Sequence, residues 1–349
     1  MIRAHAAIQK SSTIWLSLLA PVVVLLYLAL GSVPLPFIET LQVIKLTLFN
    51  QSEQAQTLYP KTNAILMHIR LPRAFAAILA GSALALAGAA MQGLFRNPLA
   101  SPNVLGISAG SSLGAVIAIT TGLSLVHPLF LPGMSVAGAM ATAALVYVIS
   151  IRIASTQQLL FIILTGLAIS SLLSGATSAL LLIAAQYEVS QYVFWTMGGL
   201  EGRMWQHSLW PAPFIIVMSA FLFSKAQALN LLSLGEENAH GMGLNVQRSR
   251  KLILILSSVL TALAISIAGP VGFIGLMVPH LVRLIVGPNH KILLPMSAYV
   301  GAMFILLADL LGRTIMPPYE IKVGIITAVV GGAYFIYLII RYQKYGRLA

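Results

Sequence analysis

The sequence of 349 residues contains no cysteine, which excludes disulfides, zinc–thiolate sites and iron–sulfur clusters. It has no G-x-x-x-x-G-K-[ST] motif either, so the chain has no phosphate-binding loop of its own. Its seven histidines are scattered singly, without an H-E-x-x-H pattern. These absences predict a protein that is not an enzyme, has no catalytic residues and binds no metal or cofactor by itself.

Charged residues are also scarce. They make up 8% of the chain, against about 25% in a soluble domain, whereas 58% of the residues are hydrophobic. Several charge-free runs reach the roughly 20 residues that a helix needs to cross a ~30 Å hydrocarbon layer. They lack the alternation of β-barrel strands. The sequence therefore predicts an all-α, polytopic membrane protein whose single transmembrane domain covers residues 1–349.

Glycine and proline divide the hydrophobic runs into separate helices. The breaks include GLSLVHPLFLPG at 122–133 and GPVG at 269–272. The N-terminus is basic, but the apolar run after it is too long for a signal peptide, so we expect it to remain as the first span. Ten helices are predicted, at 12–31, 70–92, 104–121, 133–151, 159–185, 207–225, 252–268, 271–285, 292–312 and 321–340.

The net charge of +12 is best explained by cytoplasmic loops, rather than by nucleic-acid binding. With the N-terminus inside, 13 of the 20 lysines and arginines lie on the cytoplasmic side and 7 lie outside. The bias predicts that both termini are cytoplasmic.

One polar segment interrupts this apolar chain on the predicted cytoplasmic side. LSLGEENAHGMGLN, at 232–245, lies between the sixth and seventh helices. Glu236 and Glu237 suit the first turn of a short helix, where carboxylates face the positive end of the helix dipole. Gly241 and Gly243 would end that helix. A helix this short is not stable alone, so it needs a surface to rest on.

Three further features can each be interpreted as structural or as functional. GISAG, at 106–110, matches a nucleophile-elbow pattern, but it opens an apolar helix and fits close helix packing better, as does Gly81 with its small neighbours. Asp309 is the one acid inside a predicted span, and Arg313 follows it by four residues, which suits an ion pair. Arg70 and Arg73 either snorkel at the interface or form an exposed basic patch for an acidic partner.

Six segments together resemble the FecCD-type permeases. These are the membrane subunits of bacterial ABC importers for ferric siderophores, haem and vitamin B12. The resemblance extends from about residue 12 to 341, and its RNPLA and GFIGLMVPHLVR portions are the most specific. The segments are RLPR (70–73), GSALALAGAAMQGLFRNPLASPNVLGISAG (81–110), FWTMGGLEGR (194–203), LGEENAHGMGL (234–244), GPVGFIGLMVPHLVR (269–283) and LLADLLGR (306–313).

The resemblance implies roles for particular residues. The loop at about 230–250 would form coupling helices that rest on a separate ATP-binding subunit, which carries ATP and Mg. A periplasmic binding protein would dock on the outer arginines. The segment 187–203 would form a short outer helix near the cavity mouth. The implied coupling residues are Gly235, Glu236, Glu237, Ala239, His240 and Gly243; the docking residues are Arg70, Arg73 and Arg313; the cytoplasmic gate is Asn97, Pro98, Leu99, Ser155 and Thr156.

The resemblance also implies an assembly in the bacterial inner membrane. Its parts would be two permease copies, or one copy with a paralogue, two ATP-binding subunits and the binding protein. The expected cargo is an iron complex, a ferric siderophore or haem; vitamin B12 or another metal chelate or oxyanion is the alternative within the family. An ion-coupled secondary transporter is the alternative of a different class, and Asp309 is its main support. The sequence contains no catalytic constellation of the kind that an intramembrane enzyme would need.

Overall fold

Helices account for the regular secondary structure throughout residues 20–151 and 158–345, which the computed structural model describes. Within these ranges, seven helices are long and apolar enough to cross a membrane and three shorter ones are apolar. Together they correspond to the ten predicted helices, so the sequence-based fold class is confirmed. The three shorter apolar helices are Ala20–Ala29, Ile107–Thr120 and Ile274–Val286.

The helix boundaries follow the Gly and Pro breaks closely. The long elements are α5 (Leu71–Phe95), α8 (Phe130–Ile151), α9 (Gln158–Ile183), α15 (Val246–Ala268), α17 (His290–Thr314) and α18 (Val323–Tyr345). Shorter ones are α2 (Phe37–Leu48), α3 (Ser52–Leu58), α4 (Pro60–Ile65), α6 (Ile107–Thr120), α7 (Leu123–Val126), α10 (Gln186–Thr196), α11 (Trp205–Leu209), α12 (Ala212–Ser224), α13 (Ala226–Ser233), α14 (Glu236–Gly241) and α16 (Ile274–Val286). A π turn, Leu66–Arg70, joins α4 to α5, and a 3-10 turn, Pro102–Leu105, precedes α6.

The second predicted helix begins earlier than expected. The prediction began it at residue 70, because Arg70 and Arg73 looked like the entry from water. The structure instead has one continuous helical segment, Pro60–Phe95, through the π turn. Its 36 residues span roughly 54 Å, well beyond a ~30 Å hydrocarbon layer. Arg70 and Arg73 therefore lie several turns inside a helix rather than at its end.

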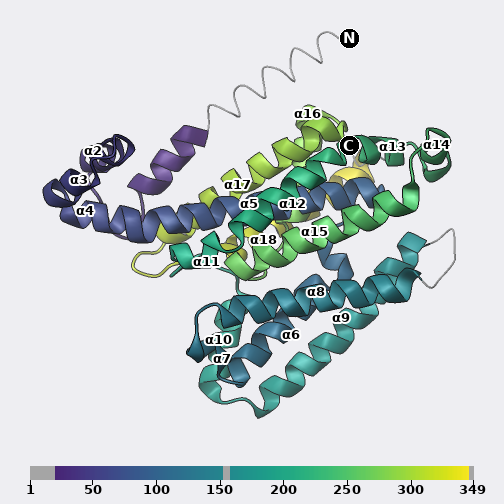
Figure 1. Cartoon of the computed structure of the whole chain (residues 1–349), viewed down its shortest axis with the longest axis horizontal. Helices are drawn as coiled ribbons and strands as arrows, with labels where there is room; N and C mark the ends of the chain where they lie inside the picture. Colours follow the sequence, from purple (N-terminus) through teal and green to yellow (C-terminus); the bar gives the residue numbers. More distant parts are fainter. Residues whose placement is uncertain (1–19, 152–157, 346–349) are drawn as a thin grey trace, which may run out of the picture.

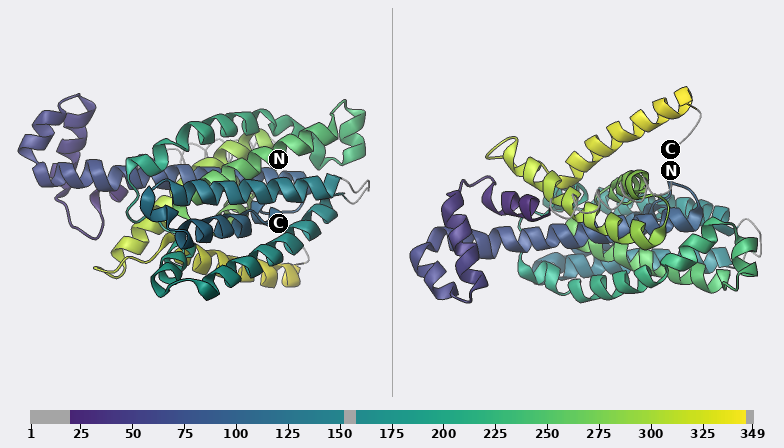
Figure 2. Two further views of the ribbon diagram at one scale, coloured as in Figure 1. Left: turned by 60° about the horizontal axis from the view of Figure 1, so that its bottom comes forward. Right: turned by 90° about the horizontal axis from the view of Figure 1, so that it is seen from above.

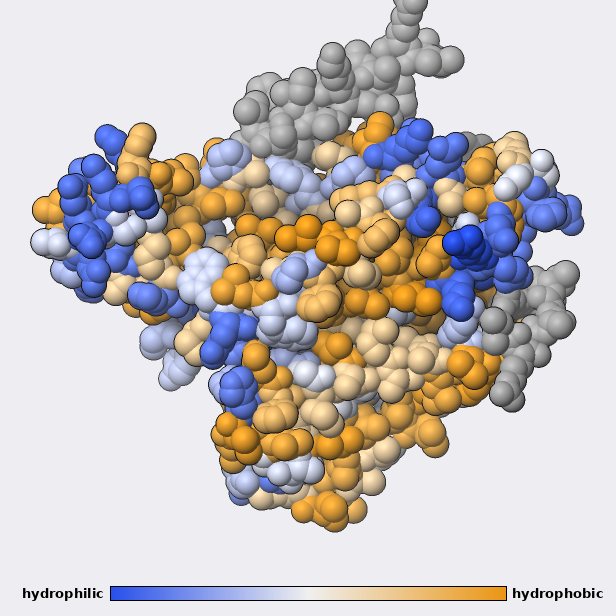
Figure 3. Space-filling view, viewed as in Figure 1, coloured by the Kyte–Doolittle hydropathy of each residue, from blue (hydrophilic) through white to orange (hydrophobic). Residues whose placement is uncertain are grey.

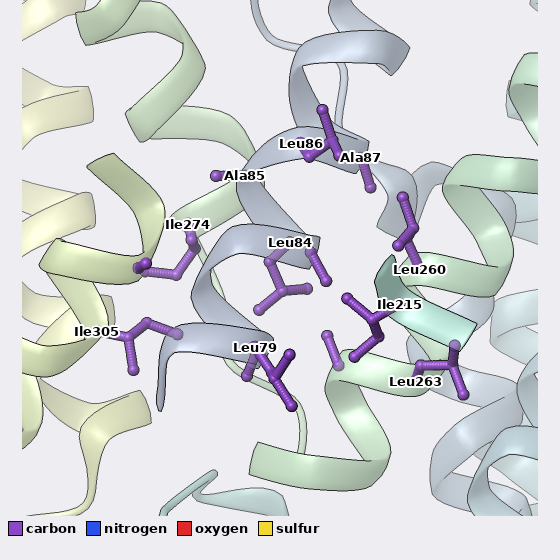
Figure 4. Packing of buried hydrophobic residues seen from close by; sticks show 14 of the residues in the cluster. Leu79, Leu84, Ala85, Leu86, Ala87, Ile215, Leu260, Leu263, Ile274 and Ile305 are labelled. Carbon is purple, nitrogen blue, oxygen red and sulfur yellow. The ribbon is translucent and has the colours of Figure 1, made fainter. Parts of the chain in front are cut away.

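Helix α5 forms the centre of the bundle. In an 18-residue hydrophobic stretch of the span Pro60–Phe95, which contains α5, 83% of the residues are buried. The corresponding value for Leu159–Ile183, the span formed by α9, is 17%. An Ala- and Gly-rich helix that is apolar on all sides can be surrounded in this way. Helices α15, α16 and α17 pack against it. Figure 4 shows Leu79 and Leu84 of α5 among Leu260, Leu263 and Ile305 from the surrounding helices.

Small residues allow the backbones to approach closely at several crossings. A Cβ at Gly81 would overlap the carbonyl group of Gly301 in α17, and one at Gly88 would overlap that of Gly275 in α16. In the same way Gly110, from the GISAG segment, lies directly against Gly138 of α8. The packing interpretation of these small-residue patterns is therefore confirmed.

The two ends of the bundle differ from its middle. Helices α2–α4 and α10 lie at one end, called here the α10 end, and α13 with α14 lies at the other, the α14 end (Figure 1). Figure 2 shows α2–α4 standing away from the bundle and α18 diverging from its neighbours. In Figure 3 the surface between the ends is mainly hydrophobic, while hydrophilic residues gather at the ends. This distribution fits a multi-pass membrane protein.

The contact between α5 and α16 generates a prediction. Gly88→Ala should destabilise the protein, because the added methyl group meets backbone atoms that cannot rotate away. Overpacking of this kind costs about 1–3 kcal/mol. Thermal unfolding of the purified protein in detergent measures the effect. Gly175→Ala in α9 is the matched control, because nothing lies within 4 Å of its added Cβ; equal unfolding temperatures for the two variants would refute the packing argument.

Candidate functional site

A buried ion-pair network joins α5 to α17 at the α10 end. The Arg73 guanidinium group binds Asp309 at two points, with Nε 2.9 Å from Oδ2 and Nη2 2.8 Å from Oδ1. Its remaining Nη1 donates to Glu320 Oε2 at 2.8 Å. The planar guanidinium matches a carboxylate in this two-point geometry. Arg73 therefore connects α5 to α17 and to the loop that follows it.

Asp309 has two further partners. The Tyr27 hydroxyl donates to its Oδ2 at 2.6 Å. Arg313 Nε lies 3.4 Å from the same oxygen, which is the i,i+4 pair predicted from the sequence. The Arg313 guanidinium carbon lies 4.2 Å from the centre of the Tyr27 ring, in cation–π contact. The carboxylate of Asp309 is thus shared among three side chains.

Arg70 has a different environment from Arg73. Its guanidinium donates to the backbone carbonyls of Leu28 and Val33, which flank the turn after the first helix. A Cβ at Gly31 would lie 3.1 Å from Arg313 Nη1 and 3.2 Å from Arg70 Nη2. Arg70 therefore holds this turn against the bundle, and Arg313 lies beside it.

The exposed basic patch predicted from the sequence is absent. The relative exposures of Arg70, Arg73 and Arg313 are 2%, 6% and 3%. The interpretation of Arg70 and Arg73 as an exposed or snorkelling pair was therefore wrong. It failed because the helix continues upstream of Arg70 and because Asp309 and Glu320, distant in sequence, supply carboxylates. In this conformation a partner protein could reach these groups only by displacing their present partners.

The polar segment at the α14 end forms the predicted short helix. Glu236 and Glu237 occupy the first turn of α14, as expected. Glu236 pairs with Arg250 of α15, and Ala239 is completely buried. Glu237 and His240 are exposed. One side of α14 therefore rests on this chain, and the other is free for a partner.

Two glycines define the ends of this segment. Gly235 has φ = 105° and Gly243 has φ = 83°, values that favour glycine. A hollow of about 610 Å³ lies between α14 and the start of α15. Its lining is Glu236, Glu237, His240, Gly243, Leu244, Asn245, Val246 and Gln247. Polar groups in an open hollow suit contact with another protein.

Helix α13 is attached to the start of α17 by three residues that the sequence reasoning missed. Asn230 Nδ2 donates to Asn289 Oδ1 at 2.9 Å, and Asn230 Oδ1 accepts from the His290 backbone N–H at 2.9 Å. The His290 ring Nδ1 lies 2.8 Å from the same Asn230 oxygen. Asn289 is also the N-cap of α17, a signal that the sequence does contain. Its pairing with Asn230, 59 residues earlier, has no sequence signal.

Comparison with known proteins identifies the chain. Its sequence matches the FecCD transport family over residues 18–341. The chain belongs to this family. It is 41% identical to the cobalamin import system permease protein of Halobacterium salinarum, over 80% of this chain and 74% of that protein. It is 38% identical to the hemin transport system permease protein of Yersinia pestis, over 80% of this chain and 84% of that protein.

A solved structure agrees with this assignment. It is described as a metal-chelate type ABC transporter in an inward-facing conformation, with a TM-score of 0.81 and 32% identity. The match covers 95% of this chain and 99% of that one. The FecCD chain therefore has the fold of a type II ABC importer permease. Within its described residues there is no group of three or more His, Asp or Glu side chains suited to a metal ion.

The expected gate of this FecCD chain is described only in part. Asn97, Pro98 and Leu99 form the turn after α5, where Asn97 Oδ1 accepts from the Leu99 backbone N–H at 2.9 Å. Asn97 is exposed. Ser155 and Thr156, the other expected half, lie outside the described residues.

The segment after α9 forms the expected short helix, α10, at the α10 end. Tyr187 is exposed, whereas Trp195 is buried and stacks with Tyr192 at 6.3 Å between ring centroids. Burial lowers the pKa of Arg203 to about 10, so this residue is still protonated at pH 7. Glu201 pairs with Lys322. Tyr187 and Trp195 thus lie in different surroundings, one exposed and one in the core.

The buried network generates a second prediction. Asp309→Asn should destabilise the isolated permease by about 3–5 kcal/mol, because Arg73 and Arg313 would keep buried charges without a carboxylate at this position. Thermal unfolding without any partner protein measures this loss. Glu320→Gln is the control and should cost less, because the Glu320 side chain is 18% exposed. If Asp309→Asn unfolded at the wild-type temperature, the network would not be what holds the bundle together.

Proposed function

We propose that this chain is the permease subunit of an ATP-driven importer that moves an iron complex, a ferric siderophore or haem, across the bacterial inner membrane. Membership of the FecCD family supports the role of a transport permease. Two relatives are named as hemin and cobalamin permeases, which supports metal chelates as the cargo class. The observation that carries the proposal is α14, a short helix with one side packed on this chain and one exposed.

In the proposed mechanism, α14 is the contact to a separate ATP-binding subunit. That subunit supplies ATP and Mg. Glu237 and His240 face the subunit, while Glu236 and Ala239 hold α14 on α15. A movement of α13–α14 would reach α17 through Asn230 and its partner His290. The two termini and α14 are then cytoplasmic, as the loop charges predict.

A periplasmic binding protein would dock at the α10 end. The burial of the three arginines changes how such docking would work. Two carboxylates pair with Arg73, and Glu320 is the more exposed of them, at 18% against 2% for Asp309. We propose that an acidic side chain of the binding protein competes with Glu320 for Arg73, in a charge-assisted pair. Asn97–Leu99, with Ser155 and Thr156, would form the cytoplasmic gate between this permease and a second copy or a paralogue.

The ion-coupled alternative receives little support from the site. A proton carrier needs a carboxylate that can release and rebind its proton. Asp309, the residue that favoured this alternative, is engaged by Arg73, Arg313 and Tyr27. A fixed structural carboxylate fits these contacts better than a carrier does.

Transport in proteoliposomes tests the proposal. The permease would be reconstituted with its ATP-binding subunit and binding protein, and uptake of a ferric siderophore, haem and cobalamin would be compared. We expect ATP-dependent uptake of one of the iron complexes. Uptake without the ATP-binding subunit would overturn the importer assignment, and uptake of cobalamin alone would overturn the cargo assignment.

The exposed side of α14 generates a third prediction. Glu237→Arg should weaken binding of the ATP-binding subunit roughly tenfold, which corresponds to about 1.4 kcal/mol, by reversing a charge at the interface. Its effect on permease unfolding should be small, since Glu237 is exposed. Co-purification and surface plasmon resonance give the affinity. Glu53→Arg, an exposed charge reversal in α3, is the control; an equal loss of affinity there would refute the assignment of α14.

A further inference from the structure

An apolar groove lies between α8 and α15, which pack side by side (Figure 1). Its volume is about 430 Å³. Apart from Lys251 and Ser258, its lining is aliphatic or aromatic, and the Ser258 hydroxyl already donates to the Leu254 carbonyl. The lining consists of Leu105, Met140, Ala143, Ala144, Tyr147, Val148, Ile162, Lys251, Leu254, Ile255 and Ser258.

The surroundings of the groove decide what can fill it. Val148 on one rim is 49% exposed and Ile255 on the other is 40% exposed. Both belong to membrane-spanning helices, so these rims face hydrocarbon. Water has few polar partners in such a groove. A lipid acyl chain has the right polarity and is present at high concentration.

One cation lies at the mouth of the groove. Lys251 is exposed, and its Nζ lies 5.7 Å from the centre of the Tyr147 ring. Among the ion pairs of the described residues, none includes Lys251. It follows the N-cap Asn245 by six residues, or about 9 Å along α15. Lys251 therefore lies in the second turn of a membrane-spanning helix, close to one of its ends.

A second cation lies one turn nearer the end of the helix. Arg248 is exposed and precedes Lys251 by three residues, so both are on neighbouring positions of one helix face. In Figure 3, hydrophilic residues adjoin the hydrophobic surface at the end nearest α14. Apolar lining with cations at one end is complementary to a phospholipid that carries net negative charge.

We propose that the α8–α15 groove is a binding site for an anionic phospholipid. One acyl chain lies in the groove, and the headgroup phosphate binds Lys251 with Arg248 beside it. In the orientation of the proposed function, with α14 cytoplasmic, this lipid belongs to the cytoplasmic leaflet. The site itself is independent of the transported cargo.

Lipid binding to the purified, delipidated permease tests the proposal. Phosphatidylglycerol and phosphatidylcholine of identical chains would be titrated and counted by native mass spectrometry. We expect phosphatidylglycerol to bind more tightly, and Lys251→Gln to weaken it about fivefold, the effect of one basic residue near a charged lipid surface. Lys251→Arg should retain binding. Lys291→Gln removes an exposed cation from the start of α17 and is the matched control.

The groove is tested separately from the charge. Ala144 lines the groove, and Ala144→Phe fills part of it, so this variant should weaken lipid binding at unchanged net charge. Competition with inorganic phosphate distinguishes binding through the headgroup alone from binding that also requires the acyl chain. We expect that phosphate does not displace the lipid. The proposal is overturned by equal binding of both lipids, by wild-type binding in Lys251→Gln, or by displacement with phosphate alone. Unfolding temperatures confirm that each variant is folded. Lipid binding and transport are measured separately, so a negative result for lipid binding would not contradict the proposed transport function.

Discussion

The ion pair between Arg73 and Asp309 fixes the position of α5 relative to α17 at one end of the bundle. Two charges this deeply buried are stable only when they are paired and hydrogen-bonded on all sides. The structure meets that requirement with Glu320, Tyr27 and Arg313. These partners come from the first helix, from α17 and from the loop after it. The network therefore holds together elements that are far apart in the sequence.

The middle of α5 is held by shape rather than by charge. Gly81 lies against Gly301 of α17, and Gly88 lies against Gly275 of α16. Inside a bilayer, helices gain little from the hydrophobic effect, so close backbone packing supplies much of their attraction. With the ion pairs at one end and glycine contacts along its length, α5 behaves as a rigid axis for the bundle.

Helix α17 extends this arrangement to the opposite end of the protein. Asp309 lies near its C-terminal end, and His290, bonded to Asn230, lies at its N-terminal end. One helix thus contacts both the arginine network and the segment that carries α14. In the proposed importer this connection gives the ATP-driven movement of α14 a physical route toward the outer side.

The sequence by itself determined the fold class, the ten apolar helices and the short helix α14, because hydrophobic run length, Gly and Pro breaks and two adjacent glutamates are local signals. It also identified the Asp309–Arg313 pair, which lies within one helix. Only the tertiary structure decided that Arg70 and Arg73 are buried, that Asn230 meets His290, and that Lys251 lies beside the α8–α15 groove. Each of these depends on side chains brought together from distant segments. Whether an arginine is exposed is set by the carboxylates and helices that pack around it, and local sequence does not contain that information.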